Sequence, residues 1–268
     1  MNALEAKFEK MGARVKFRSP VFRRNNGSKV IDNREIIRID VRKDKEGTYF
    51  DILKGGGIEV SVLDVQPKDR HLLLMARSQN GDKAKWLAGH DERDWFVAAV
   101  PENKPVSSVV TAKQALKPDA VVAAEDKVGV KPAKRQKRKN EARKRQGEWF
   151  FIPAPNAKVD EKLILKNEPL RRGRGKPHMA EELYRLGGET VYVGIGSSNG
   201  ISASAYAKLT ADQRKSGRWR PMTRNPKVYV RGKIRHSDHK TIVLDCWHLV
   251  EMNTETQAVA MRNVAFLD

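Results

Sequence analysis

The chain has 268 residues, which is long for a single compact core and comfortable for two. Hydrophobic residues make up 39% of it and charged residues 32%, so the chain can build cores and is not disordered as a whole. Its formal net charge of +20 favours a polyanionic partner, and no apolar run reaches the ~18 residues that a membrane-spanning helix needs. Cys246, the one cysteine, excludes an intrachain disulfide, argues against a thiolate zinc site and fits a reducing cytoplasm.

The first hundred residues alternate between short β-rich runs and turns. Leu4, Phe8 and Met11 have helical spacing, and no apolar core of a secretory signal precedes them. Five predicted strands follow, separated by Gly-, Asn- and Pro-containing turns, at residues 37–41, 48–53, 58–63, 71–76 and 94–100. This spacing predicts an N-terminal β-rich domain, residues 1–103, folded as an antiparallel meander or a small barrel.

Strand patterning stops near residue 101, and residues 104–147 are predicted to form a partly helical, strongly basic linker. Thr111 with Gln114 fits a capping box, and Pro118 fits the start of a helix over residues 119–126. Residues 131–145, called here the basic segment, then hold nine Lys or Arg and one acid, so two-fifths of the net charge lies in them. The basic segment has no apolar face, which predicts a solvated tether that is extended or transiently helical.

A C-terminal domain, residues 148–268, is predicted to be α+β and to end in a long hairpin. Strands are expected at residues 149–152, 162–165 and 190–193, a helix at 180–186, and short helices at 202–209 and 211–215. Between them, the glycine- and serine-rich residues 194–200 fit a flexible loop, because neither phosphate-binding glycine motif is complete. The hairpin strands are expected at 227–235 and 241–252. The whole chain is therefore predicted to be α+β and predominantly β.

Cation placement is the strongest functional signal, because each Lys or Arg that neutralises a phosphate releases a counterion and adds affinity. The stretch from Arg171 to Lys176 adds guanidinium groups between glycines just before the predicted helix, which is typical of an anion site. Trp219, between two arginines, is a candidate for base stacking. The predicted nucleic-acid-binding residues are Lys131, Lys134, Arg135, Lys137, Arg138, Lys139, Arg143, Lys144, Arg145, Arg171, Arg172, Arg174, Lys176, Arg218, Trp219 and Arg220.

Histidines supply the one hint of catalysis. If the protein is an enzyme, the catalytic candidates are His178, His236, His239 and His248. Three of these, His236, His239 and His248, are also weak candidates for a divalent metal, although the spacing of two residues between His236 and His239 lies outside a helix. In a hairpin, His236 and His248 are too far apart to bind one ion easily. Cys246 beside Trp247 and His248 is interpreted as a buried cysteine, because neighbours on a strand face opposite sides.

The leading hypothesis is a nucleic-acid-binding protein and not an enzyme, with no required cofactor and RNA slightly favoured over DNA. It would grip phosphates through the basic segment and the Arg/Gly stretch. The alternative is a His-dependent nuclease or phosphodiesterase acting on RNA or DNA, with or without a divalent metal. A further alternative is a scaffold whose basic arm packs nucleic acid. Protein partners, organism and oligomeric state have no sequence signal.

Overall fold

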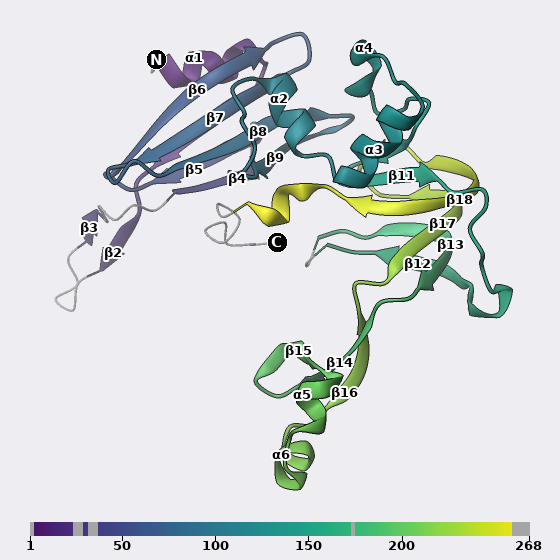
Figure 1. Ribbon diagram of the computed structural model, residues 1–268. Coiled ribbons are helices and arrows are strands. Elements are labelled where there is room, and N and C mark those ends of the chain that lie inside the picture. The colour runs from purple at the N-terminus through teal and green to yellow at the C-terminus, as the bar shows by residue number, and fades with distance from the viewer. Residues whose placement is uncertain (1–2, 24–28, 32–36, 173–174, 259–268) are drawn as a thin grey trace.

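The structure of the protein is a computed structural model, which describes residues 3–23, 29–31, 37–172 and 175–258. It is mostly β, with 48% strand and 19% helix, and this confirms the predicted class. Figure 1 shows an N-terminal body of two sheets, a six-stranded sheet beside it and a small arm that projects from the six-stranded sheet. In the described part of the chain, no helix has the length and apolarity needed to cross a bilayer.

The N-terminal body stacks two sheets. The first has the order β1-β5-β4 and the second the order β6-β7-β8-β9. A separate pair, β2 with β3, lies beside them. The elements of this body are α1 (Ala3–Lys10), β1 (Arg14–Arg18), β2 (Val21–Arg23), β3 (Lys29–Ile31), β4 (Ile37–Asp44), β5 (Gly47–Lys54), β6 (Ile58–Gln66), β7 (His71–Ser78), β8 (Lys83–Asp91) and β9 (Asp94–Val100).

Alternating side chains fill the space between these sheets. Phe50 on β5 and Trp86 on β8 are buried in one cluster with Phe8 of α1. The second sheet of the body is a β6-to-β9 meander, as the turn spacing predicts, although β8 is not among the predicted strands. In the first sheet, β1 pairs with β5 in parallel. The outer face of the meander is also apolar, through Leu73 and Leu87, and it packs against the helix that follows β9.

The chain after β9 is helical, and the first of its helices packs onto this outer face. Its helices are α2 (Val109–Ala115), α3 (Asp119–Lys127) and α4 (Pro132–Arg135). The helix expected after Pro118 is confirmed, with Pro118 as its N-cap. The capping box of α2 is formed by Ser108 and Thr111, three residues earlier than the sequence pair chosen for it. Apolar residues of α2 close the second core.

The prediction that the basic segment is a solvated tether is wrong. Arg143 is 2% exposed, and its Nε lies 3.2 Å from an oxygen of the fully buried Glu125 in α3. Arg138 forms ion pairs with Asp91, the last residue of β8, and with Glu92, in the turn between β8 and β9. The segment ends as β10 (Lys144–Gln146), which pairs with a strand of the second large sheet. Acidic residues distant in sequence hold it in place, and a local charge count cannot detect them.

The second large sheet has six antiparallel strands in the order β10-β11-β18-β17-β13-β12. Its core contains Phe151, Leu183 and Val230. After β18 the chain returns to the N-terminal body, where Thr254 Oγ1 donates to the carbonyl of Ala115 at 2.8 Å. The remaining elements of this part are β11 (Trp149–Pro153), η1 (Glu161–Leu163), β12 (Leu165–Leu170), β13 (His178–Leu186), β17 (Lys227–Arg235), β18 (Ile242–Met252) and η2 (Thr254–Gln257).

The helix predicted over residues 180–186 is wrong, because this stretch is β13. A register shift between Ala180 and Glu182 places the buried Ala180 and Leu183 three residues apart, which imitates helical spacing. The strand predicted over residues 162–165 is also displaced, since η1 occupies its first half and β12 begins at Leu165. The terminal hairpin is confirmed as β17 and β18, and the strand predicted over residues 149–152 as β11.

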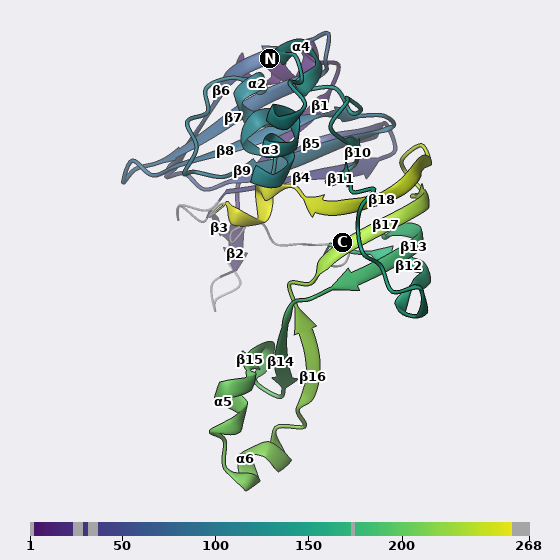
Figure 2. The same cartoon turned by 45° about the vertical axis from the view of Figure 1, so that its right-hand side comes forward.

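The arm, defined here as residues 187–226, joins the end of β13 to the start of β17. It projects away from the N-terminal body and from the six-stranded sheet in the two views (Figures 1 and 2). It consists of β14 (Glu189–Gly194), β15 (Ser197–Ser202), α5 (Ala203–Ala207), α6 (Ala211–Ser216) and β16 (Arg220–Arg224). The strand predicted over residues 190–193 and both short helices are confirmed. The flexible loop expected over residues 194–200 is wrong, because β15 pairs with β14 across a tight turn.

Candidate metal centre

Three histidines from two separate parts of the chain meet at one end of the six-stranded sheet. His178 is the first residue of β13, while His236 and His239 lie in the loop between β17 and β18. One nitrogen from each ring lies within 4.8 Å of the others. The rings stack, with centroids 4.1 Å apart for His178 and His236 and 4.7 Å apart for His236 and His239. We call these three residues the histidine cluster.

Gly147 makes this close approach possible. It follows β10 with φ +56°, a left-handed conformation that favours glycine. A Cβ at Gly147 would lie 3.0 Å from Nε2 of His239 and 3.1 Å from Nε2 of His178. The Nε2 atoms of two cluster members therefore converge on the same stretch of backbone, at a position where a side chain would crowd them.

Burial leaves the cluster with nitrogens that lack partners. His178 is 1% exposed, and neither of its ring nitrogens has a hydrogen-bond partner within the described residues. Burial, with His236 and His239 nearby, lowers the pKa of His178 to about 3, and burial also lowers the pKa of His236. Neutral imidazoles are the form that binds metals. A buried polar group without a partner costs on the order of 1–3 kcal/mol, which a bound ion would offset at His178.

Carboxylates and backbone groups surround the cluster. Oε2 of Glu92 lies 3.5 Å from Nδ1 of His239 and accepts a hydrogen bond from the backbone N–H of Lys240 at 2.7 Å. Asp238 pairs with Lys176 at 2.9 Å, and its backbone N–H donates to Nδ1 of His236 at 3.1 Å. Coordination of a metal by His236 would replace this last hydrogen bond. If Nε2 binds the metal, Nδ1 carries the proton and can no longer accept; if Nδ1 binds the metal, its lone pair is already used.

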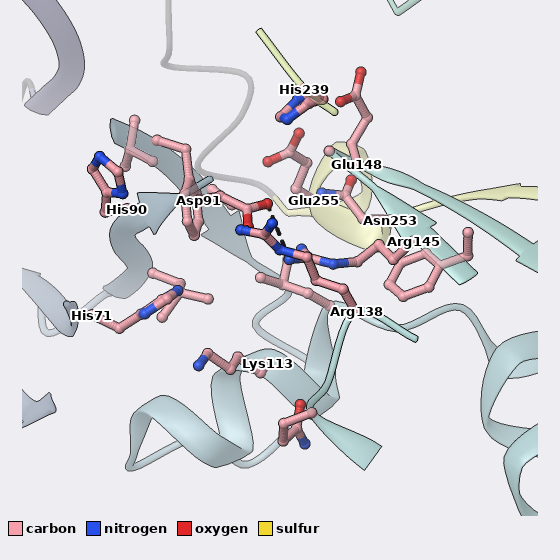
Figure 3. Close-up of a pocket in the computed structure, with 18 of the residues that line it drawn as sticks. His71, His90, Asp91, Lys113, Arg138, Arg145, Glu148, His239, Asn253 and Glu255 are labelled. Carbon is pink, nitrogen blue, oxygen red and sulfur yellow. Dashed lines mark hydrogen bonds and ion pairs between the residues drawn. The ribbon is translucent and has the colours of Figure 1, made fainter. Parts of the chain in front are cut away.

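A cavity of about 660 Å³ adjoins the cluster (Figure 3). It lies between the β8–β9 hairpin, α2, the basic segment and the start of β11, and His239 lines it. Glu148, the residue after Gly147, is half-buried and lines the same cavity (Figure 3). Charged groups of both signs complete the wall, including Lys113, Arg145 and Asp91. A ligand in this space would lie beside the cluster and would meet a carboxylate as well as cations.

No protein-family model, curated protein or solved structure matches this chain.

The structure brings together two of the three metal candidates from the sequence and adds His178, which the sequence proposes only for catalysis. His248 lies elsewhere, in the middle of β18 opposite Val230, and its Nδ1 contacts the carbonyl of Cys246 at 2.8 Å. The two side chains share one face of the strand, since they are two residues apart, and Sγ of Cys246 lies 3.9 Å from Nδ1 of His248. The sequence interpretation that separated them onto opposite faces is wrong, and Cys246 is only partly buried.

The predicted phosphate-binding cations fall into three groups. Within the basic segment, Arg135, Arg138, Arg143 and Arg145 are at least half-buried and paired with acids, whereas Lys131, Lys137 and Lys139 are exposed. Lys134 is exposed and pairs with Glu141, and Lys144 Nζ donates to the carbonyl of Val243 at 2.6 Å. The outward-facing cations of this segment are thus mostly lysines.

The other two groups lie beyond the basic segment. Arg171 is exposed, Arg172 pairs with Glu255, Lys176 pairs with Asp238, and Arg174 lies outside the described residues. The helix whose dipole was expected to assist this stretch does not form, because β13 follows it. Arg218, Trp219 and Arg220 lie in the arm, with both arginines exposed and the tryptophan half-buried.

The sequence gives no signal for Glu92 or Gly147. Glu92 lies in a hairpin turn about 150 residues away from His239 and Lys240, the two residues of the β17–β18 loop that it contacts. A glycine followed by an acid before a strand, as in Gly147-Glu148, resembles an ordinary turn. Tertiary contacts bring them to the cluster: Glu92 contacts His239, and Gln146, the residue before Gly147, donates hydrogen bonds to the carbonyls of Ile234 and Lys240.

Proposed function

We propose that the protein is a divalent-metal-dependent hydrolase of phosphodiesters, with the metal held by His178, His236 and His239. The observation that carries the proposal is the convergence of three imidazoles beside a cavity, with both ring nitrogens of the buried His178 left without partners. Three histidines and an open fourth position are typical of catalytic zinc sites. The net charge of +20 favours an anionic substrate such as the backbone of RNA or DNA.

The ligand set favours zinc or a neighbouring transition metal over magnesium and calcium. Imidazole nitrogen suits Zn²⁺, Co²⁺ and Ni²⁺, whereas Mg²⁺ and Ca²⁺ prefer oxygen. Zinc–nitrogen bonds of about 2.0–2.1 Å place tetrahedral ligand atoms roughly 3.3 Å apart. The present spacing of up to 4.8 Å is wider, so metal binding would require the stacked rings to rotate and the loop between β17 and β18 to shift.

The chemistry would follow from the position of the cavity. A bound metal lowers the pKa of its water to about 7 and so supplies hydroxide at neutral pH. Glu148 would accept the proton that this water loses. The hydroxide would attack phosphorus and the bond to the leaving oxygen would break, and that oxygen would take up the proton that Glu148 had accepted. Cavity cations such as Arg145 would stabilise the charge on the non-bridging oxygens.

Metal binding is the first measurement. Protein stripped with EDTA is titrated with Zn²⁺ and Co²⁺ by calorimetry, and the Co²⁺ form is examined for the visible absorption of a tetrahedral site. We expect one equivalent to bind, and His236→Gln to weaken binding by about 100-fold or more. His90→Gln is the matched control, because His90 lines the same cavity outside the cluster. Equal metal affinity in wild type and His236→Gln would refute the metal site.

Hydrolysis is measured separately on bis(p-nitrophenyl) phosphate and on labelled RNA and DNA. We expect turnover that EDTA abolishes, that Zn²⁺ or Co²⁺ restores and that His236→Gln lacks. Glu148→Gln should retain the metal and lose most of the turnover, by roughly 10²–10⁴-fold. Metal binding without hydrolysis of any of these substrates would leave the metal site standing and refute the hydrolase.

A further inference from the structure

We infer that the arm is a nucleic-acid-binding element that contacts phosphates through Lys215, Arg218 and Arg220. The proposal goes beyond the metal centre and does not depend on it. The arm holds six basic and two acidic residues, and one of the acids, Glu189, is already paired with Arg224 at 2.7 Å. Within the described residues, Lys208, Lys215, Arg218 and Arg220 form no ion pair, and all four are exposed.

The arm has almost no core of its own. Of the side chains from residue 189 to residue 224 whose exposure is described, only Val191 is buried. The strand β16 lies at the edge of the sheet β15-β14-β16, and its first four residues are exposed. Figure 2 shows the arm reaching away from both large sheets. The arm therefore buries little apolar surface and leaves most of its polar and charged side chains exposed to a partner.

The geometry of the arm directs its arginines outward. Trp219 lies flat on two glycines, since a Cβ at Gly217 or Gly194 would come within 2.2 Å or 2.7 Å of its ring. Its indole N–H donates to the carbonyl of Gln213 at 3.1 Å. Arg218, immediately before it, has φ +47°, which is uncommon outside glycine. Trp219 thus fixes the turn, and its two neighbouring arginines remain exposed on the surface.

This arrangement changes the role expected of Trp219. The sequence predicts a base-stacking platform, whereas the indole makes its edge contact with Tyr206, at a centroid distance of 6.0 Å, within the arm. Tyr206 in turn stacks on Tyr192 at 3.7 Å, with the rings nearly parallel. The aromatic side chains therefore hold the arm together, and the arginines and lysines are the groups left to bind a partner.

Nucleic acid fits this surface better than a membrane or an apolar protein face. Guanidinium groups bind phosphate through two parallel hydrogen bonds, and arginine outnumbers lysine in the arm by four to two. The exposed apolar side chains Ile195 and Met222 do not form one patch. In the pairing of β14 with β16, Met222 lies opposite Val191 and Arg220 lies opposite Val193. Ile195 follows the end of β14. Arg220 therefore lies between Met222 and Ile195 and separates the two exposed apolar side chains.

The test compares two matched triple variants. In one, Lys215, Arg218 and Arg220 are each replaced by glutamine; in the other, the exposed Lys131, Lys137 and Lys139 of the basic segment are replaced in the same way. Binding of labelled single-stranded RNA, single-stranded DNA and duplex DNA is followed by fluorescence anisotropy across a series of KCl concentrations, with EDTA present throughout. Circular dichroism and thermal unfolding confirm that both variants are folded.

We expect the arm variant to lose about tenfold or more in affinity and to lower the salt slope by about 2–3, since each phosphate contact contributes close to one unit. The lysine variant should stay within about threefold of wild type. Equal losses in both variants, or a loss only in the lysine variant, would overturn the assignment to the arm. Binding to anionic phospholipid vesicles without binding to nucleic acid would also overturn it. Because EDTA is present, failure of the metal centre cannot produce these outcomes.

Discussion

The carboxylate of Glu92, in the turn between β8 and β9, lies 3.5 Å from Nδ1 of His239, in the loop between β17 and β18. The contact links the N-terminal body to the histidine cluster. In metal sites, a carboxylate on the outer nitrogen of a ligating histidine orients the ring and raises its basicity. Glu92 occupies this position if His239 binds the metal through Nε2, because Glu92 faces Nδ1 of the ring while Nε2 faces Gly147.

Replacing Glu92 by Gln should weaken zinc binding by about 10- to 100-fold, the usual effect of losing such an outer partner. Calorimetric titration measures the change directly. Glu59→Gln on β6 is the control, because Glu59 is an exposed carboxylate of the same body that is remote from the cluster in the fold. Unchanged zinc affinity in Glu92→Gln would show that the two residues are merely close.

A second prediction concerns the buried ion network that holds the basic segment. Lys117 and Arg143 are each 2% exposed and both contact the fully buried Glu125, at 2.7 and 3.2 Å. Burial lowers the pKa of both cations, and Glu125 opposes that shift. Glu125→Gln should lower the free energy of unfolding by about 3–5 kcal/mol, because it leaves two buried cations without their counter-charge.

Urea unfolding measures this loss, and Lys134→Gln is its control. Lys134 pairs with Glu141, but both side chains are about half exposed, so their pair is worth about 1 kcal/mol or less. If Glu125→Gln unfolds at the same urea concentration as Lys134→Gln, the basic segment is not held by this network.

These contacts show how far the sequence can predict the fold. Strands such as β17, and the helix that begins after Pro118, follow from local pattern and turn chemistry, which one segment carries by itself. The basic segment does not, because Glu125 and Asp91 lie outside it and only tertiary structure brings them near. The strand β13 was mistaken for a helix because a bulge at Ala180 changes the spacing of its buried residues.

The candidate site divides in the same way. The sequence indicates His236 and His239 as neighbouring metal candidates, because they share one loop. It also names His178 as a catalytic candidate, but nothing in the sequence places His178 next to the other two. The pairing of β13 with β17 does so, since Met179, next to His178, pairs with Arg235, next to His236. Such a pairing depends on register between residues 56 positions apart, Met179 and Arg235, which residue types alone do not determine.

A third prediction concerns pH. Burial, with Lys113 nearby, lowers the pKa of His71 to about 4. An unfolded chain binds a proton at this residue below about pH 6.5, so between about pH 6.5 and 4 the unfolded state binds more protons and the free energy of unfolding falls as the pH falls. His71→Gln should make that decline shallower by up to about 3 kcal/mol between about pH 7 and 4. Urea unfolding at a series of pH values checks it, and parallel curves for the two proteins would contradict it.

The last prediction separates backbone strain from crowding at the cluster. Gly147 and Gly129 both have left-handed φ values, +56° and +65°, but a Cβ at Gly129 meets nothing within 4 Å, whereas one at Gly147 meets Nε2 of both His239 and His178. Gly129→Ala should therefore cost about 1–2 kcal/mol of stability, from strain alone, and leave zinc affinity unchanged. Gly147→Ala should cost more and should weaken zinc binding by about tenfold or more, because the added methyl group occupies the space into which the two nitrogens converge. Thermal unfolding and zinc titration of both variants measure the difference. If the two variants lose the same stability and keep the same zinc affinity, the absence of a side chain at Gly147 is not required for the histidines to bind zinc.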